Sequence, residues 1–486
     1  MIAQPRLRPD LLPDDWQAWA AILVFLLDVT ASLHAVLHKR DTRAAISWVG
    51  FIWLVPVIGV TLYGLFGLNR IRRQAIDIHR ARRQIASSLT GPDTAPWLAG
   101  QARPRLAGLA RLTGHLTGRP LLGGNSIEPL LDGDEAYPAM LEAIEGATAS
   151  VALCSYIFAD DAAGGKFVSA LGRAVARGVE VRVLIDDVGM RYTSPAVHHA
   201  LRRAGVPVGR FLPIVSSRGV AFFNLRTHRK VLVVDGRIAF AGGMNIHGDN
   251  VAAAHPRRPV RDVHFRVLGP VVHQLMDAFA EDWLFVTREL LDGPVWYAPI
   301  AQRGSIAARV ITDGPDRDFE IVRHVLLGAI ASARESVAIV TPYFLPDSAL
   351  MTALSVAALR GVRVDIVLPS QGNIAIAQWA SRAMLWQLLK PGCRVHLTPA
   401  PFDHAKLLVV DRSWALIGTS NWDPRSLRLN FELDVECYDE HFAARVQHLV
   451  DDRVRTSRPF TLADADGRPF LERVRDGVAR LASPYL

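Results

Sequence analysis

Two short stretches of the chain repeat one set of chemically active residues. In the first, "HRKVLVVDG" begins at His228 and places Lys230 two residues later. In the second, "HAKLLVVDR" begins at His404 and places Lys406 in the same way. Residues i and i+2 of a β-strand point to the same face of a sheet. Each His is therefore expected to project from a strand together with its Lys.

An Asn follows each pair at the same distance, with Asn245 after His228 and Asn421 after His404. A site holding two imidazoles, two ammoniums and two amides suits a phosphodiester. The ammoniums and amides can bind the non-bridging oxygens and stabilise developing charge. One imidazole can attack phosphorus to form a covalent phosphohistidine, while the other protonates the leaving oxygen and then acts as a general base. The residues alone leave open which His attacks.

Carboxylates are expected to orient the two rings. Asp262 in "RDVHF" and Glu432 in "NFELD" are the candidates, since each follows its Asn at a moderate distance. Asp235 and Asp411 complete the two motifs and are also candidate catalytic residues. Their alternative role is to fix the turn that belongs to the Lys-bearing strand.

Two other interpretations of the paired motifs are weaker. A two-metal phosphoesterase could use His228, His404, Asp235 and Asp411 as ligands. The Lys two residues after each His disfavours it, because an ammonium repels a cation, so we expect no metal and no other cofactor. A pair of structural histidines is disfavoured because Gly and Asn residues follow both motifs in a matched pattern.

The elements that must position these residues belong to a sequence repeat. Residues 143–158 match residues 329–344, and residues 170–186 match residues 353–369. Each block has the pattern of helix and strand in alternation, which predicts an α/β layer fold in each half. Two such halves predict pseudo-twofold symmetry with the site on the axis.

The repeat also predicts the domain boundaries. We expect one α/β domain at 121–300 and a second at 301–486, after a basic linker at 76–120. The apolar runs Val231–Val234 and Leu407–Val410 are typical of strands covered on both faces. Small residues at the far end of the return strand (Gly242, Gly243 and Gly418) would let a ligand or backbone approach closely.

Residues 1–75 have the composition of a membrane hairpin. Residues 16–36 and 44–67 are each long and apolar enough to span a bilayer. Pro56 is expected to kink the second span, which membrane helices tolerate. Asp28 is costly inside the first span, and the sequence does not explain its role. A cleaved signal peptide or a buried helix pair is disfavoured, since a second apolar stretch follows at once and no clear cleavage site is present.

The chain is basic, with 55 Lys and Arg residues against 47 Asp and Glu residues and a net charge of +8 among 486 residues. This balance favours anionic partners such as nucleic acid or an acidic lipid surface. Arginines cluster at 70–83, which predicts by the positive-inside rule that the rest of the chain is cytoplasmic. Only five residues are Lys, and two of them are Lys230 and Lys406, so the chemistry requires an ammonium there. The 3 Cys exclude a disulfide scaffold.

The doubled motif, each copy followed by Gly and Asn, resembles the phospholipase D superfamily. Within it, "HRKVLVVDGRIAFAGGMNI", "HAKLLVVDRSWALIGTSNWDPRSLRLNFEL", "TPYFLPD" and the N-terminal spans are similar to bacterial cardiolipin synthases. The resemblance implies two phospholipase D-type α/β domains with the site between them. It also implies a multi-pass protein of the bacterial inner (cytoplasmic) membrane, with both catalytic domains in the cytoplasm.

The expected reaction follows from the same resemblance. Two phosphatidylglycerol molecules would give cardiolipin and glycerol by reversible phosphatidyl transfer, with His228 favoured as nucleophile and no metal. Expected partners are phosphatidylglycerol and anionic membrane lipids, not nucleic acid, while oligomeric state and the use of phosphatidylethanolamine are left open. The chain departs from relatives at Gly243, where many have Ser, and at Cys154, where many have a carboxylate.

The alternatives are a phospholipase D hydrolase, another phosphatidyltransferase, a nuclease of the same superfamily, or an inactive scaffold. A nuclease needs no membrane hairpin, and a scaffold would be expected to lose at least one His or Lys.

Overall fold

A computed structural model describes residues 16–39, 42–67, 104–213 except 193 and 195, 225–315 and 320–483. The chain divides into two compact units, Met1–Arg73 and Gln74–Leu486. The arginine cluster at 70–83 and residues 76–103 of the expected linker lie outside the described residues.

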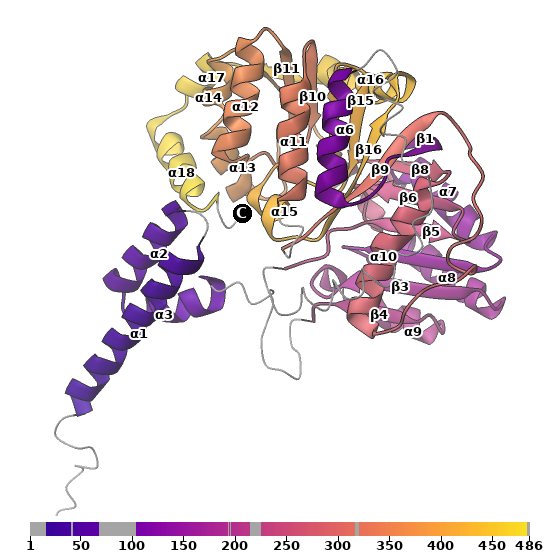
Figure 1. Ribbon diagram of the computed structural model, residues 1–486, viewed down its shortest axis with the longest axis horizontal. Helices are drawn as coiled ribbons and strands as arrows, with labels where there is room; N and C mark the ends of the chain where they lie inside the picture. The colour runs from indigo at the N-terminus through magenta and orange to yellow at the C-terminus, as the bar shows by residue number, and fades with distance from the viewer. Residues whose placement is uncertain are drawn as a thin grey trace, which may run out of the picture. The chain divides into compact units, whose positions relative to one another are not determined.

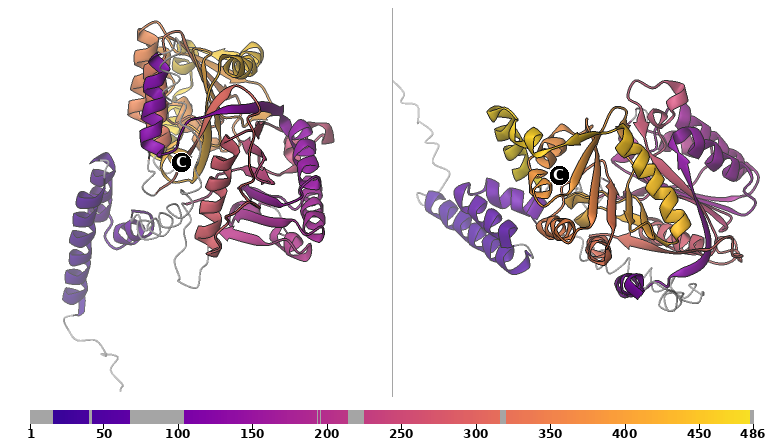
Figure 2. Two further views of the ribbon diagram at one scale, coloured as in Figure 1. Left: turned by 45° about the vertical axis from the view of Figure 1, so that its right-hand side comes forward. Right: turned by 90° about the horizontal axis from the view of Figure 1, so that it is seen from above.

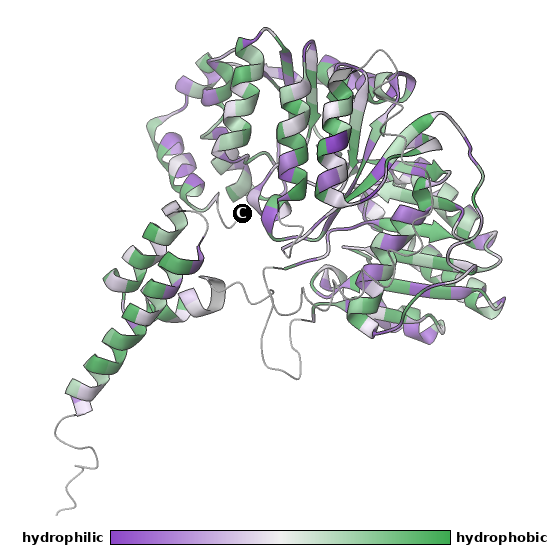
Figure 3. Ribbon diagram, viewed as in Figure 1, coloured by the Kyte–Doolittle hydropathy of each residue, from purple (hydrophilic) through white to green (hydrophobic). Residues whose placement is uncertain are grey.

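The N-terminal unit contains one helix, α1 (Trp16–His38), that is long and apolar enough to cross a membrane, judged over the described residues. Figure 3 shows α1 hydrophobic along most of its length. α2 (Thr42–Leu54) packs against it through a small apolar cluster that includes Ala35 and Ile52. Asp28 is buried on α1.

The second expected span is not one continuous helix. α2 ends at Leu54, Val57 takes a left-handed φ of 68°, and the chain resumes as α3 (Ile58–Leu62) and a π-helical turn, η1 (Tyr63–Gly67). The break follows from Pro56, whose ring lacks an N–H and disfavours helical conformation in the residue before it. Sequence predicted a kink there, but the interruption is larger than a kink.

The second unit is built on one sheet of fifteen strands. Its strands run in the order β17-β12-β11-β10-β14-β15-β16-β9-β1-β8-β6-β5-β2-β3-β4. The strands of the first half are β1 (Leu122–Leu131), β2 (Ser150–Ser155), β3 (Glu180–Asp186), β4 (Val208–Phe211), β5 (Val231–Val234), β6 (Ile238–Gly242) and β8 (Val263–Leu268). Those of the second half are β9 (Ile306–Asp313), β10 (Ser336–Val340), β11 (Arg363–Pro369), β12 (Arg394–Thr398), β14 (Leu407–Val410), β15 (Trp414–Gly418), β16 (Glu432–Tyr438) and β17 (Arg458–Phe460).

The strand order has the symmetry that the repeat predicted. Outward from the centre, β9-β16-β15-β14-β10-β11-β12 mirrors β1-β8-β6-β5-β2-β3-β4, and β1 pairs with β9 to join the halves. The strands β2, β3 and β4 of the first half are parallel to one another, as are β10, β11 and β12 of the second half, and the other pairings in this sheet are antiparallel. The edge strand β17 pairs antiparallel with β12 and has no counterpart in the first half. β5 and β14, which carry the motifs, occupy equivalent interior positions, so all four residues of each are buried.

Helices cover both faces of the sheet (Figures 1 and 2). In the first half they are α7 (Asp132–Glu145), α8 (Ala162–Ala176), α9 (His198–Arg203) and α10 (Val271–Thr287). In the second half they are α11 (Ile321–Ser332), α12 (Ser348–Leu359), α13 (Ala375–Arg382), α14 (Trp386–Leu389), α15 (Pro424–Arg428), α16 (Glu440–Thr456), α17 (Leu462–Asp466) and α18 (Phe470–Leu481). The expectation of two α/β halves related by pseudo-twofold symmetry is confirmed, and one apolar N-terminal helix of the described residues is long enough to span a membrane.

Part of the expected linker is folded. Residues Pro104–Thr117 form α6, which lies beside α11 in Figure 1. Leu106, Leu109 and Ala110 follow helical spacing and enter the core of the second half. The prediction of a basic linker rested on the charged residues of this segment and therefore missed its short apolar stripe.

Candidate active site

Each His–Lys pair lies just before a buried strand and is fixed to the opposite half of the molecule. The His228 N–H donates to Phe431 O at 2.8 Å, and the His404 N–H donates to Arg261 O at 2.7 Å. The segment before His404, β13 (Phe402–Asp403), also pairs in parallel with β7 (Val260–Arg261). The two halves therefore hold each other through the segments that lead into the motifs.

The candidate carboxylates bind the rings in a crossed arrangement. Glu432 Oε2 of the second half lies 2.9 Å from His228 Nδ1 of the first. Asp262 Oδ2 of the first half lies 2.8 Å from His404 Nδ1 of the second. A carboxylate on Nδ1 favours the tautomer with its proton there and leaves Nε2 for chemistry. Neither half can build a complete His–carboxylate pair alone.

Both lysines are buried against their own motif. Lys230 Nζ donates to His228 O at 2.7 Å, and Lys406 Nζ donates to His404 O at 2.6 Å. Lys406 Nζ also lies 2.9 Å from His404 Nε2. Burial lowers the pKa of Lys230 to about 7 and that of Lys406 to about 8. These ammoniums are costly to bury, which is expected at a site made to receive an anion.

The imidazoles are neutral in the free site. Burial, with added repulsion from Lys230 and Lys406, lowers the pKa of His228 well below its ordinary value. Burial and the charge of Lys406 lower the pKa of His404 to about 4, although the hydrogen bond that His404 donates to Asp262 acts to raise it. Because the pKa of His228 responds to Lys406 and His404, the two motifs share one electrostatic environment.

The two carboxylates differ in their surroundings. Burial raises the pKa of Glu432, although Lys230 and hydroxyl donors oppose it. For Asp262, burial acts to raise the pKa, but the hydrogen bond from His404 and nearby positive charge outweigh it, so the pKa is lowered. Glu432 accepts hydrogen bonds from Thr419 Oγ1 at 2.6 Å and Ser426 Oγ at 2.7 Å.

The two halves also differ at Gly243. It occupies the position in its strand connection that Thr419 occupies in the other half, judged from the matched registers of β6 and β15. A Cβ at Gly243 would lie 2.7 Å from Asp262 Oδ1. A side chain at Gly243 would therefore clash with the carboxylate of Asp262. Asp262 accepts a hydrogen bond from the backbone N–H of its neighbour Val263, whereas Glu432 accepts one from the hydroxyl of Thr419.

The side chains of the two Asn residues differ in their hydrogen bonding. Asn245 Oδ1 accepts from the Ile157 N–H at 3.0 Å and so holds the loop that follows β2. Asn421 is buried, and its Oδ1 has no hydrogen-bond partner among the described residues. Of the two residues, only Asn421 has an unsatisfied amide oxygen.

Asp235 and Asp411 lie at the other end of the strands. Asp235 accepts hydrogen bonds from the backbone N–H groups of Thr148, Ala149 and Ser150. Asp411 accepts from the equivalent groups at residues 334–336. The four residues of β5 or β14 separate each carboxylate from its Lys. The geometry does not bring these aspartates to the His pair, and it matches the alternative role of fixing the turn.

Aromatic rings at the site were not singled out from the sequence. The rings of Tyr156 and His228 lie 5.3 Å apart, and Lys230 Nζ lies 5.3 Å from the centre of the Tyr156 ring. The Phe402 ring lies 6.0 Å from the His404 ring. "SYIF" falls in the matched repeat blocks, so its position could have indicated Tyr156. Cys154 is buried and contacts Arg229 O, and burial raises its thiol pKa to about 12, so it stays uncharged.

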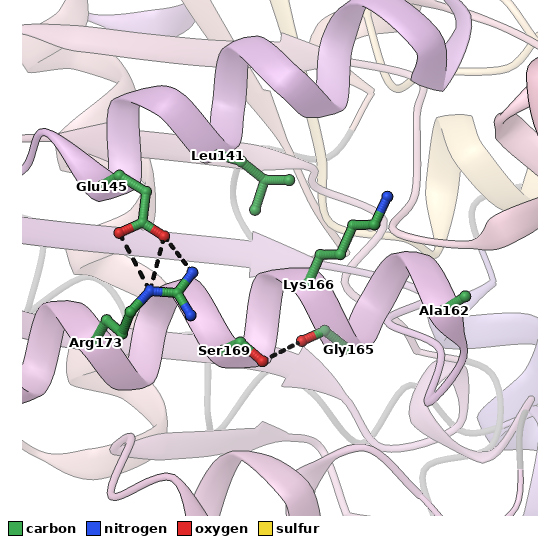
Figure 4. Close-up of a pocket in the computed structure, with 7 residues that line it drawn as sticks. All are labelled: Leu141, Glu145, Ala162, Gly165, Lys166, Ser169 and Arg173. Atoms are coloured by element: carbon green, nitrogen blue, oxygen red, sulfur yellow. Dashed lines mark hydrogen bonds and ion pairs between the residues drawn. The ribbon is translucent and has the colours of Figure 1, made fainter.

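A separate pocket of about 480 Å³ lies between α7 and α8. Figure 4 shows it lined by Leu141, Lys166 and the ion pair between Glu145 and Arg173. None of the His–Lys residues lines this pocket. In the described part of the chain, no group of three or more His, Cys, Asp or Glu residues has the geometry to hold a metal ion.

Family models and curated relatives match this chain to the same family of proteins. The family model for the PLD-like domain of cardiolipin synthase matches residues 140–283 and 326–453, and a phospholipase D-nuclease N-terminal model matches residues 20–67. Cardiolipin synthase A of Pseudomonas putida (strain GB-1) is 33% identical over 478 residues, covering 96% of this chain and 97% of the relative. The major cardiolipin synthase ClsA of Bacillus subtilis (strain 168) is 31% identical over 477 residues, covering 96% and 98%.

A solved structure supports the fold. The phosphatidylserine synthase of Haemophilus influenzae Rd KW20 aligns with a TM-score of 0.60 and 16% identity, over 78% of this chain and all of the other. At that identity the likeness concerns the fold alone.

Proposed function

The chain belongs to the cardiolipin synthase family of phospholipase D-like proteins, and we propose that it joins two phosphatidylglycerol molecules into cardiolipin and glycerol through a phosphatidyl-histidine intermediate. One observation carries the mechanism. Each half supplies a His–Lys pair and the carboxylate that orients the other half's His. The site residues and their roles below are part of the proposal.

In the first step, His228 Nε2 attacks phosphorus while the bond from phosphorus to the headgroup glycerol oxygen breaks. One observation favours His228 over His404 as the nucleophile. Both rings are neutral in the free site, as a nucleophile must be, so their pKa values do not distinguish them. In the described part of the chain His228 Nε2 has no hydrogen-bond partner, whereas His404 Nε2 lies 2.9 Å from Lys406 Nζ.

His404 acts as the general acid in that step. The bound phosphodiester is an anion beside His404, and a nearby opposite charge raises the pKa of an imidazole. Binding therefore helps to protonate a ring that is neutral in the free site. The proton goes to the departing glycerol oxygen, and Asp262 stabilises the imidazolium that supplies it.

Lys230, Lys406 and the amide of Asn421 bind the non-bridging oxygens. Both ammoniums are buried, so their interaction with a phosphate is stronger than at an exposed site. We propose that these side chains neutralise the phosphate and that no metal is required.

The second step is the reverse of the first with a new alcohol. His404, now neutral, removes the proton from a hydroxyl of a second phosphatidylglycerol headgroup. That oxygen attacks phosphorus, the bond from phosphorus to His228 breaks, and cardiolipin is released. Because the bonds broken and formed are of one kind, the reaction is reversible.

We also propose that the protein is a multi-pass protein of the bacterial cytoplasmic membrane, with the unit from Gln74 onward in the cytoplasm. α1 supports one membrane span, and the match at residues 20–67 extends over both apolar stretches. α2 and α3 form the second, broken stretch. The arginine cluster at 70–83 supports the cytoplasmic orientation.

Product analysis tests the function. Purified full-length protein reconstituted into phosphatidylglycerol vesicles should form cardiolipin and free glycerol as its main products, with phosphatidic acid minor. The reason is that lipid hydroxyls are concentrated at the surface where the intermediate forms. Added glycerol should reduce net cardiolipin formation. If phosphatidic acid is the main product, the protein is a hydrolase and the proposed synthesis is wrong.

The lysine pKa values predict a dependence of substrate binding on pH. Lys230 with a pKa of about 7 and Lys406 with a pKa of about 8 are charged below these values and neutral above them. The KM for phosphatidylglycerol should therefore rise about ten-fold or more between pH 6 and pH 9, since a charged hydrogen bond contributes about 1.5–3 kcal/mol. The measurement is KM in mixed micelles at a fixed mole fraction of lipid. Lys406→Arg should remove the upper part of the rise, and a constant KM over this range would contradict charge pairing by these lysines.

A further inference from the structure

The C-terminal helix α18 (Phe470–Leu481) has an unusual distribution of side chains. Its large apolar residues point outward. Their exposed fractions are 76% for Phe470, 78% for Leu471, 45% for Val474, 61% for Val478 and 76% for Leu481. At 100° per residue these five positions fall within about a 100° sector of the helix. A stripe this wide normally faces a protein core.

The polar side of α18 faces the protein instead. Asp476 is buried and pairs with Arg468 and Arg475. The Arg475 guanidinium lies 4.6 Å from the centre of the Trp379 ring on α13, which is the helix that α18 packs on. Figure 1 shows α18 and α13 at the same side of the second half. Ion pairs and a cation–π contact thus hold the helix in place, and its apolar stripe is left uncovered.

The charge around the stripe is positive. Segment 468–481 contains the four arginines Arg468, Arg473, Arg475 and Arg480 against Glu472 and Asp476. Arg473 and Arg480 are exposed and lie one after the other along one edge of the stripe. An apolar helix face bordered by arginines fits the interface of a bilayer, where the stripe enters the acyl region and the guanidiniums meet lipid phosphates.

The helix also lies close to the His–Lys site. Ala479 packs in a small apolar cluster with Leu345, and Tyr343 packs against that cluster. The Tyr343 ring lies 6.3 Å from the Phe402 ring, which in turn contacts His404. Packed side chains therefore connect α18 to the surroundings of His404.

We propose that α18 is an interfacial helix that docks the catalytic unit on an anionic lipid bilayer, so that the His–Lys site receives phosphatidylglycerol from the membrane surface. This contact is additional to the N-terminal apolar helix and lies at the opposite end of the chain. It rests on the proposed function only for the identity of the lipid that enters the site. α13, on which α18 packs, has the exposed apolar residue Ile376 in its first turn and is preceded by exposed Ile374.

Site-specific labelling tests the contact independently of activity. All three native cysteines, Cys154, Cys393 and Cys437, are buried, so a single introduced Cys can be labelled selectively. Full-length Leu471→Cys and Val478→Cys variants would carry an environment-sensitive fluorophore in vesicles of phosphatidylglycerol and phosphatidylcholine. Leu359→Cys is the matched control, because Leu359 is 73% exposed at the end of α12.

The proposal expects a blue-shifted emission at positions 471 and 478, with about two-fold or greater quenching by spin labels placed near the lipid headgroup, and neither effect at 359. Vesicles of phosphatidylcholine alone should weaken both effects. Water-like emission at 471 and 478 in anionic vesicles would overturn the proposal. So would protection of these positions in detergent together with a dimer mass, because a second copy of the chain would then cover the stripe.

A functional comparison follows from the same idea. Leu471→Glu combined with Val478→Glu should lower cardiolipin formation in vesicles about five-fold or more, since charge opposes insertion of the stripe. The same variant should retain full activity on short-chain phosphatidylglycerol below its critical micelle concentration, which also shows that it folds. Equal loss on both substrates would overturn the docking role. If the wild type forms no cardiolipin at all, the proposed reaction fails, while the label emission still decides the docking.

Discussion

Replacing either His228 or His404 by Ala is expected to reduce cardiolipin formation by about a thousand-fold or more, because the nucleophile and the acid act as a unit. The double variant should be about as active as either single variant, because losing one member of the unit already removes its contribution. Production of cardiolipin and glycerol from phosphatidylglycerol is the measurement. His324→Ala is the matched control, since His324 is an exposed residue of α11 in the same chain.

A substrate with a good leaving group separates the two roles. Phosphatidyl-p-nitrophenol needs no proton to release its alcohol, so His404→Ala should still give a burst of p-nitrophenol equal to the enzyme present. The phosphohistidine should then accumulate at His228, where digestion and mass analysis can find it. His228→Ala should give no burst. A burst from His228→Ala with a trapped phosphate on His404 would reverse the assignment, and strong turnover of phosphatidylglycerol in both single variants would contradict a shared site.

Much of the site could be predicted because its residues stand at fixed distances from one another in the chain. The repeat predicted that the pair His404 and Lys406 matches the pair His228 and Lys230. The expectation that each pair projects from a strand was not met, because both pairs lie just before β5 or β14. The structure brings all four into one electrostatic environment. Strand order could be predicted only as far as the symmetry, since the repeat does not state that β1 pairs with β9.

The crossing of carboxylates could not be predicted from the sequence. Asp262 and Glu432 were candidates because each follows an Asn, and this spacing says nothing about which ring each one meets. The partner is decided by contacts between the halves, where β13 pairs with β7 and Phe431 bonds to His228. Those contacts join residues more than 140 positions apart, beyond the reach of local patterns.

Other features were missed for local reasons. The break at Pro56 is larger than expected, since Val57 adopts a left-handed conformation that a β-branched residue rarely takes. Thr419 in a loop and Ser426 in α15 hold Glu432, but no sequence pattern marks a single Thr or Ser for such a role. The turn contacts of Asp235 depend on where the β2 strand begins, which the motif alone does not show.

The crossed carboxylates lead to the second large effect. Glu432→Gln and Asp262→Asn should each lower cardiolipin formation about a hundred- to ten-thousand-fold, because an amide no longer stabilises the charged ring or favours its Nδ1–H tautomer. For Glu432 the amide also presents an NH2 group to one of the two hydroxyls, of Ser426 or Thr419, that donate to the two carboxylate oxygens. Steady-state rates on phosphatidylglycerol, with circular dichroism to verify folding, provide the measurement.

The two carboxylate variants should differ in the step that they slow, and the crossing determines how. Glu432 serves His228, so Glu432→Gln should suppress the p-nitrophenol burst. Asp262 serves His404, so Asp262→Asn should keep the burst and slow the turnover that follows. Asp235→Asn is the control: it loses hydrogen bonds at the turn, which should lower the free energy of unfolding by about 1–3 kcal/mol and leave the folded enzyme active. If Asp262→Asn abolishes the burst while Glu432→Gln keeps it, the nucleophile is His404, and the mechanism runs through the opposite half.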